Sequence, residues 1–268
     1  MKNLIKIAAL SLGMIAAILT ILVFGRTEAL LMMPQTTPEA FLAGMPYRDI
    51  SLLGDELVLI QPGSTLWVYL LGILTVAIGI YFLATRNTEK SRLNWGIGLI
   101  LWGLGALLAG TSYQAFGYEL KCRGRSLCLF TSDFELIYLL VTAWSINFLV
   151  AATAFSSARG KLRKCVLVFS VADGIAYSLF LIVGSILPNR FLVSYEGFMA
   201  FIGINFLFMF VLNILHYHKE RDRLNRNMIM IWVGFLVVNL GYFAALFSGY
   251  ASNLYDKGGI WFNENDVL

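Results

Sequence analysis

Long apolar stretches of about twenty residues recur along the whole chain, and short charged clusters separate them. A helix needs about that length to cross a hydrocarbon core of roughly 30 Å. Only helices or closed barrels satisfy their backbone groups in lipid, and these stretches lack the strict alternation of barrel strands. The pattern predicts an all-α, polytopic transmembrane helical bundle with seven complete spans and the start of an eighth. The expected spans cover residues 7–24, 65–85, 95–117, 135–157, 165–187, 198–216 and 228–250, and the eighth begins after Trp261.

This pattern divides the chain into three parts. Residues 1–29 are the first span or a signal peptide, residues 30–64 are an outer segment, and residues 65–268 are the transmembrane helical bundle. The first apolar run follows two lysines and precedes a candidate cleavage site after Ala29, as in a signal peptide, but it is longer than a usual signal core. Both alternatives leave the later spans unchanged.

The outer segment, residues 30–64, is too long for a plain connection between two helices. Its Thr37-Pro38-Glu39 sequence supplies a cap, a first-turn proline and a first-turn acid, which predicts a short helix over Glu39 to Met45. Residues 56–60 are typical of an extended apolar stretch. The segment is either a lid that packs on the helix ends or a long tether, and the sequence leaves both open.

Charged residues are few, and the basic ones concentrate in connectors that are expected on one side of the membrane. Residues of hydrophobic type make up 59% of the chain and charged residues 13%, whereas about a quarter of a soluble domain is charged. The basic connectors 86–92, 159–164 and 219–226 are expected in the cytoplasm by the positive-inside rule, with the N-terminus if the first span is retained. We therefore expect an integral protein of the plasma membrane or the bacterial inner membrane. Membrane lipids are the expected partners, and the net charge of +4 does not imply nucleic acid.

One outer connection departs from the charge rule, because it carries Lys121, Arg123 and Arg125. The same loop holds Cys122 and Cys128, which an oxidising exterior would join in a disulfide. The three cysteines of the chain are too few for a disulfide scaffold or a zinc finger, and no metal site follows from them.

Asp173 is the one acidic residue expected inside a span. An ionised carboxylate is unfavourable there unless it is paired or faces a cavity, so Asp173 is a candidate for function. The alternative is that it lies near enough to the cytoplasmic surface to pair with Arg163 or Lys164. Asparagines also occur within spans and are expected to form hydrogen bonds between helices. They are Asn147, Asn205, Asn213 and Asn239.

Polar residues gather where spans end at the outer face. Ser112 and Gln114 close the third span, while Asp133 and Glu135 open the fourth. Consecutive helices of a bundle lie side by side, so these four residues are expected to share a ligand pocket between the two spans. Carboxylates and amides in one layer could bind a cation or act as a general acid or base. The alternative is a solvated rim of acidic residues.

Residues 110–116 (GTSYQAF) and 131–138 (TSDFELIY) resemble the superfamily of alkaline ceramidases, hemolysin III proteins and the adiponectin and progestin receptors. In that seven-span superfamily, a serine and a histidine end one span and an aspartate begins the next. Two histidines on the last span complete a zinc site that hydrolyses amides or esters in lipids. By position, the resemblance assigns Ser112 or Thr111 to the serine, Gln114 to the histidine and Asp133 to the aspartate.

Gln114 is a poor zinc ligand, and the printed residues hold no counterpart of the last-span histidines. We therefore expect a catalytically degenerate ceramidase-like bundle that binds lipid or a small ligand at its outer face. No catalytic residue or cofactor is identified, and zinc enters only through the resemblance. The alternatives are a metal-dependent lipid amide or ester hydrolase, with metal at Asp133, and a secondary transporter, with a water-lined path around Asp173.

Overall fold

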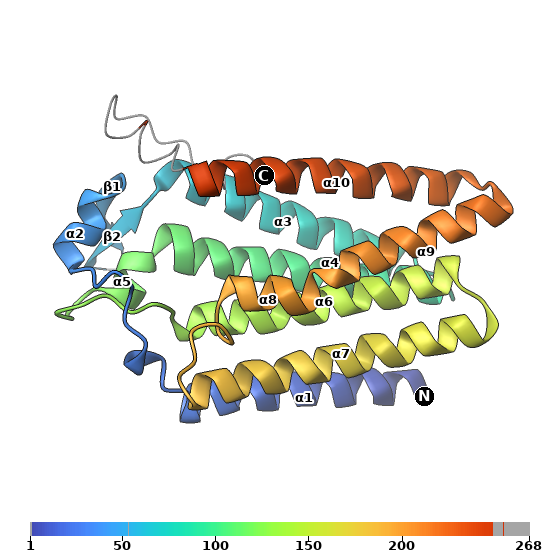
Figure 1. Ribbon diagram of the computed structural model, residues 1–268, viewed down its shortest axis with the longest axis horizontal. Coiled ribbons are helices and arrows are strands. Elements are labelled where there is room, and N and C mark those ends of the chain that lie inside the picture. Colours follow the sequence, from blue (N-terminus) through green and yellow to red (C-terminus); the bar gives the residue numbers. More distant parts are fainter. Residues whose placement is uncertain (1, 53, 249–253, 255–268) are drawn as a thin grey trace.

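The computed structural model describes residues 2–52, 54–248 and 254. Its long helices run side by side, and the short elements of the outer segment gather at one end of the bundle (Figure 1). The long helices are α1 (Lys2–Phe24), α3 (Pro62–Ala84), α4 (Lys90–Ala109), α6 (Asp133–Ser157), α7 (Gly160–Ile186), α9 (Ile204–Glu220) and α10 (Arg223–Ser248). The short elements are η1 (Thr27–Ala29), α2 (Pro38–Ala43), β1 (Tyr47–Leu52), β2 (Asp55–Ile60), η2 (Gly110–Ala115), α5 (Gly117–Lys121) and α8 (Tyr195–Ile202).

Six helical segments among the described residues are long and apolar enough to cross a membrane. They are Pro62–Ala84, Lys90–Ala115, Asp133–Ser157, Gly160–Ile186, Tyr195–Glu220 and Arg223–Tyr242. In α1, the apolar part with described side chains is Ser11–Phe24, which is shorter than these segments. The chain is therefore an integral membrane protein built as a helical bundle. The first of the seven expected spans stays a prediction, and the expected eighth lies outside the described residues.

Helix α6 is the centre of the bundle and packs against α1, α4, α7 and α9. It is buried over most of its length and circumference, because it is apolar on nearly every side and has neighbours around it. The main core surrounds α6 and includes the fully buried side chains of Leu139, Leu140, Leu181 and Ile202.

Helices α3 and α4 approach each other closely at glycines. A Cβ on Gly103 would lie 2.5 Å from the carbonyl oxygen of Gly72, and one on Gly79 would lie 2.8 Å from the backbone nitrogen of Ile100. Small residues allow such backbone contact between membrane helices, whose association depends on van der Waals packing. The two helices therefore form a tightly packed pair, and α4 joins this pair to α6.

Two of the expected spans are not single regular helices. The span expected at 95–117 is α4 followed by a π-helical turn, η2, and then α5. The span expected at 198–216 is divided into α8 and α9 at Gly203. Hydrophobic periodicity detects neither feature, because the apolar character of the sequence continues through both.

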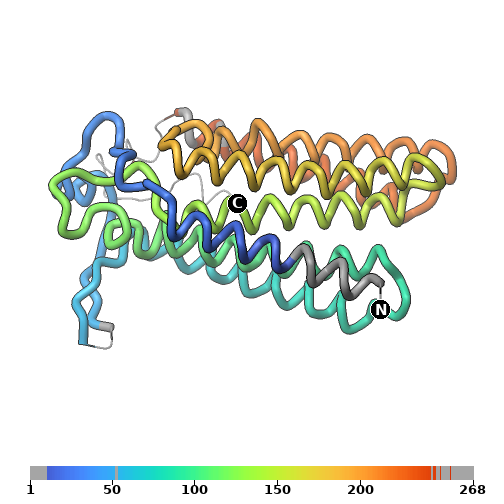
Figure 2. Tube along the Cα trace, turned by 90° about the horizontal axis from the view of Figure 1, so that it is seen from below, coloured from blue at the N-terminus to red at the C-terminus, as the bar shows by residue number. Residues whose placement is uncertain are grey.

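The outer segment packs on one end of the bundle. Helix α2 is capped by the Thr37 side chain, and β1 and β2 form an antiparallel hairpin that projects from the bundle end (Figure 2). Phe41 and Ile60 form a second, small core with Cys122 and Cys128. The Met32 N–H also donates to the Cys128 carbonyl oxygen at 3.0 Å. The segment thus lies against the loop between the third and fourth expected spans, as a lid does.

Candidate functional site

The outer end of α4 continues as the π-helical turn η2. The Phe116 N–H donates to the carbonyl oxygen of Thr111, five residues back, at 2.8 Å. A 3.0 Å hydrogen bond between the hydroxyls of Tyr69 and Thr111 ties the turn to α3. Such turns are rare and frequently mark functional sites. Here the turn carries Tyr113 and Gln114, which both line a cavity.

This cavity has a volume of about 850 Å³, within the range of roughly 300–1,000 Å³ that is usual for ligand sites. Helices α3 and α4 line one side of it, α8, α9 and α10 line the other, and α6 lies between them. Trp67, Leu70 and Leu74 of α3 also line it and are 60%, 41% and 53% exposed. We call it the outer cavity. Because α3 is long and apolar enough to cross the membrane, the outer cavity opens sideways toward lipid at these three residues.

The walls of the outer cavity change from polar to apolar along the bundle. Next to the outer segment they include Tyr113, Gln114 and Glu196. Toward the middle of the spans they are formed by aromatic and aliphatic side chains, with the ring centres of Phe206 and Phe235 4.6 Å apart. The apolar residues at this inner end are Trp102, Ile146, Phe206 and Phe235. This gradient matches an amphipathic molecule with its polar end outward.

Two buried polar atoms in these walls lack a hydrogen-bond partner among the described residues. They are Oε1 of Gln114 and Oγ1 of Thr142, whose side chains are 4% and 7% exposed. A buried polar atom without a partner destabilises a fold by about 1–3 kcal/mol, so native structures usually satisfy it. Because Oε1 of Gln114 only accepts hydrogen bonds, the missing partner is a hydroxyl or an N–H group.

Of the four outer residues expected to share a pocket, Gln114 lines the outer cavity and the others do not. Glu135 is buried and pairs with Lys121, whose ammonium lies 2.7 Å from a Glu135 carboxylate oxygen. The same ammonium is 5.1 Å from the ring centre of Tyr113. The buried pair therefore contacts the cavity wall through the Tyr113 ring, from the side away from the cavity.

Ser112 and Asp133 point elsewhere. The Ser112 hydroxyl donates to the Leu108 carbonyl oxygen of its own helix at 3.0 Å, and its side chain is fully buried. Asp133 accepts a hydrogen bond from the Thr27 hydroxyl at 3.3 Å, which links the start of α6 to η1. The structure thus brings Gln114 and Glu135 to two sides of one wall, while Ser112 and Asp133 stabilise helix ends.

The basic outer loop is balanced by acidic residues. Besides the Lys121 pair, Arg123 lies 2.8 Å from Glu119, and Arg125 lies 3.2 Å from Glu28. The hydrogen bond and the charge of Glu119 raise the pKa of Arg123. Each basic residue of the loop therefore has a local counter-charge.

The expected disulfide between Cys122 and Cys128 is present, with an S–S distance of 2.02 Å. It closes the loop that follows α5, and both cysteines are fully buried beneath the outer segment. Cys165, at the opposite end of the bundle, is a free and exposed thiol.

The residues of this region do not fit a zinc site. Zinc in proteins is held by histidine, cysteine or carboxylate ligands. Within the described ranges, no group of three or more His, Cys, Asp or Glu side chains could hold a metal ion. Asp133 is bonded to Thr27, and Gln114 offers only a neutral amide. The zinc site implied by the resemblance therefore has no donor set in the described residues.

Asp173 lies midway along α7 and bonds to two amides from other spans. The side-chain nitrogens of Asn147 and Asn205 donate to the same Asp173 oxygen, Oδ2, at 3.0 Å and 2.9 Å. Arg163 instead donates to the Ala158 carbonyl oxygen at 2.8 Å. In the described residues Asp173 has no salt bridge, so pairing with Arg163 or Lys164 is not what the structure shows.

Several residues of the outer cavity were not predicted from the sequence. Tyr138, Thr142 and Ile146 lie four residues apart on α6 and form one cavity-lining stripe. That spacing is a signal of a shared helix face. It does not stand out in α6, because almost every residue of this helix is apolar and buried.

Asn147 and Asn205 were expected to bond between helices, and they do so through Asp173. Asn213 accepts from the Ser157 hydroxyl at 3.3 Å and joins α9 to α6 in the same way. Asn239 donates to the Phe235 carbonyl oxygen of its own helix at 2.8 Å. Expectations of bonding between helices thus hold for three of the four asparagines in the described structure.

No protein-family model matches the chain, and comparison with curated proteins and with solved structures likewise finds no match.

Proposed function

We propose that this membrane protein binds a single-chain amphipathic lipid in the outer cavity and does not hydrolyse it. The observation that carries the proposal is the unpartnered Oε1 of Gln114 in the polar part of a cavity with apolar inner walls. Once the Gln114 amide turns Oε1 toward the cavity, a hydroxyl or amide N–H of a lipid headgroup would satisfy that atom. The acyl chain would lie against Trp102, Phe206 and Phe235. The opening beside Trp67 and Leu74 gives access from the bilayer.

This proposal agrees with the resemblance of residues 110–138 to ceramidase-like proteins while assigning no reaction. In the superfamily, catalysis depends on a zinc ion with histidine ligands. Gln114 replaces one such histidine, and Asp133 does not line the cavity. We therefore infer a lipid-binding, catalytically degenerate bundle, and a metal-dependent hydrolase is the alternative to be tested.

Binding of a fluorescent N-acylethanolamine to the purified protein tests the proposal, because its headgroup offers both an amide N–H and a hydroxyl. We expect saturable binding that is lost in Ala106→Phe, since Ala106 lines the cavity and a phenyl ring would fill it. Gln114→Leu should weaken binding about five-fold, which corresponds to one hydrogen bond of about 1 kcal/mol.

Ser112→Ala is the matched control, because Ser112 is buried in the same helical turn but does not line the cavity. It should bind the probe as the wild-type protein does. A folded Ala106→Phe variant with unchanged affinity would contradict the proposal. Release of free fatty acid from the probe, measured by mass spectrometry, would favour the hydrolase instead.

A further inference from the structure

Three spans meet at Asp173, away from the outer cavity. Asp173 lies midway along α7, Asn147 belongs to α6, and Asn205 lies in the first turn of α9, just after the break at Gly203. Both amide nitrogens donate to Oδ2 of Asp173. Asn147 is 2% exposed and Asn205 is fully buried, whereas Asp173 itself is half-buried.

Close packing of α6 and α7 brings Asp173 within reach of Asn147. A Cβ on Gly174 would lie 3.0 Å from the Trp144 ring, so glycine at this position lets that ring rest directly on the α7 backbone. The Trp144 ring nitrogen then donates to the Ser178 hydroxyl at 3.1 Å. The helices are thus held together at Gly174 and Ser178, just after Asp173, and by the hydrogen bond from Asn147 to Asp173.

The charge of this cluster is not balanced by the described residues. Two amide nitrogens donate to one oxygen of Asp173, and an ionised carboxylate within a membrane span needs a counter-charge. Asp173 forms no salt bridge in the described part of the chain. A cation bound at the cluster would supply that counter-charge.

Oxygen atoms are available to hold that charge. The side-chain oxygens of Asn147 and Asn205 are buried and have no hydrogen-bond partner among the described residues. Each is on the same carbon as a nitrogen that contacts Asp173, so both lie near the carboxylate. The hydroxyl of Tyr177, one helical turn along α7 from Asp173, is also buried without a partner in the described structure.

We propose that Asp173, Asn147 and Asn205 form a binding site for one monovalent alkali cation. One carboxylate neutralises one positive charge, whereas a divalent cation would leave a net charge in the bundle. A cation at the carboxylate would replace the two amide donors, and half a turn of the Asn205 amide would bring its oxygen to the cation. The same turn at Asn147 would also give up its 3.1 Å hydrogen bond to the Ala143 carbonyl oxygen. Carbonyl-type oxygens replace the hydration shell of alkali cations. The proposal is independent of lipid binding, because none of the three residues lines the outer cavity.

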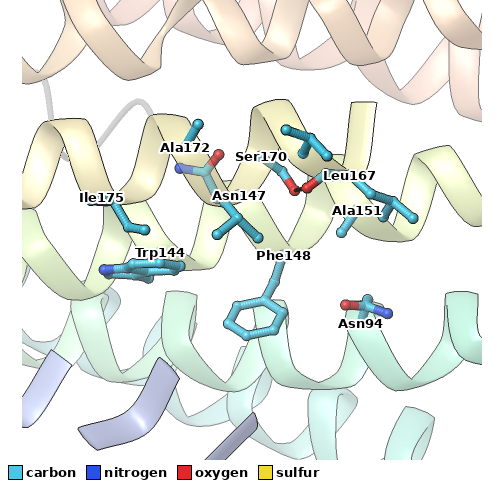
Figure 3. A pocket seen from close by; sticks show the side chains of 11 residues that line it. Asn94, Trp144, Asn147, Phe148, Ala151, Leu167, Ser170, Ala172 and Ile175 are labelled. Atoms are coloured by element: carbon cyan, nitrogen blue, oxygen red, sulfur yellow. Dashed lines mark hydrogen bonds between the residues drawn. The ribbon is translucent and has the colours of Figure 1, made fainter. Parts of the chain in front are cut away.

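A second cavity borders the cluster at Asn147. Its volume is about 540 Å³, and Asn147 and Trp144 form part of its wall (Figure 3). Asn94 and Leu167, from the first halves of α4 and α7, lie at its other end. The cavity therefore runs from the cluster toward the end of the bundle that is opposite the outer segment.

Thermal unfolding of the detergent-purified protein in choline chloride, with NaCl or KCl replacing it at constant ionic strength, tests the site. We expect a saturable rise in Tm with at least one alkali cation, because a ligand at ten times its Kd favours the folded form about eleven-fold. Asp173→Asn should abolish this rise. Asp49→Asn, which changes an exposed acid of the hairpin, should keep it.

Equilibrium binding of ²²Na⁺ to the wild-type protein, with unlabelled NaCl and KCl as competitors, keeps the test decisive if Asp173→Asn does not fold. One competed site per chain, weakened in Asn205→Ala, supports the proposal. Equal Tm values in choline, sodium and potassium chloride, with no bound ²²Na⁺, would overturn it. A Tm that depends on pH but on neither cation would also overturn it, because Asp173 would then bind a proton.

Discussion

The ammonium of Lys121 lies 2.7 Å from the carboxylate of Glu135, and their side chains are only 9% and 3% exposed. Lys121 ends α5 and Glu135 lies in the first turn of α6, so the pair joins the two ends of the connection that contains the disulfide. Removing one member of a buried pair leaves an uncompensated charge. The same ammonium contacts the Tyr113 ring, so the pair also supports the outer cavity.

We expect Lys121→Met and Glu135→Leu each to lower the free energy of unfolding by about 3–5 kcal/mol. The double variant should lose much less than the sum of the two, because it leaves no buried charge. Chemical denaturation in detergent measures these differences. Arg125→Gln is the control, since its pair with Glu28 is exposed and should contribute about 1 kcal/mol or less. Single variants as stable as the wild type would show that the pair is not buried.

The contact between α3 and α4 predicts a steric effect at Gly103. A Cβ there would lie 2.5 Å from the Gly72 carbonyl oxygen, so Gly103→Ala should force the helices apart and destabilise the protein by about 1–3 kcal/mol. Gly234→Ala in α10 is the matched control, because no atom lies within 4 Å of its added Cβ. Equal Tm values for the two variants would argue against this helix contact.

Asp222, in the connection between α9 and α10, is expected to make the stability of the protein depend on pH. Although partial burial opposes ionisation, hydrogen bonds from Asn225 lower the pKa of Asp222 below its ordinary value of 3.8. The ionised carboxylate therefore stabilises the folded state above pH 3.8, and this contribution is lost as pH falls through the lowered pKa. Asp222→Ala should lower Tm at pH 7, and its difference from the wild type should shrink as pH approaches 3. A difference that does not change with pH would contradict this role.

The orientation of the bundle is predicted by its basic connectors. In a Cys165→Ser background, we expect a membrane-impermeant thiol reagent on intact cells to label Ser51→Cys but not Thr88→Cys or Lys161→Cys. Permeabilised cells provide the control, because all three cysteines should then react. Labelling of Thr88→Cys and Lys161→Cys in intact cells, without labelling of Ser51→Cys, would show that the topology is inverted.

Gln114 and Asp173 could be identified from the sequence because a polar residue in or beside an apolar span is unusual in itself. Their surroundings could not be identified in the same way. Thr142 is far from Gln114 along the chain, and Asn205 is far from Asp173, so only the packing of helices shows that each pair shares a site. For the same reason, the expected pocket at Ser112, Gln114, Asp133 and Glu135 placed the right helix ends together but did not predict which side chains face the outer cavity.

The sequence by itself determined that the chain is a helical membrane protein, approximately where its long helices lie, and that Cys122 and Cys128 share a loop. These properties are local, because the length of an apolar run and the spacing of its flanking charges decide them. The tertiary structure alone decided that α6 is central, that α4 ends in a π-helical turn, and that a cavity remains between α3 and α10. Those features depend on contacts between residues far apart in the chain, and in a span that is apolar on every side, no sequence period shows which face meets which neighbour.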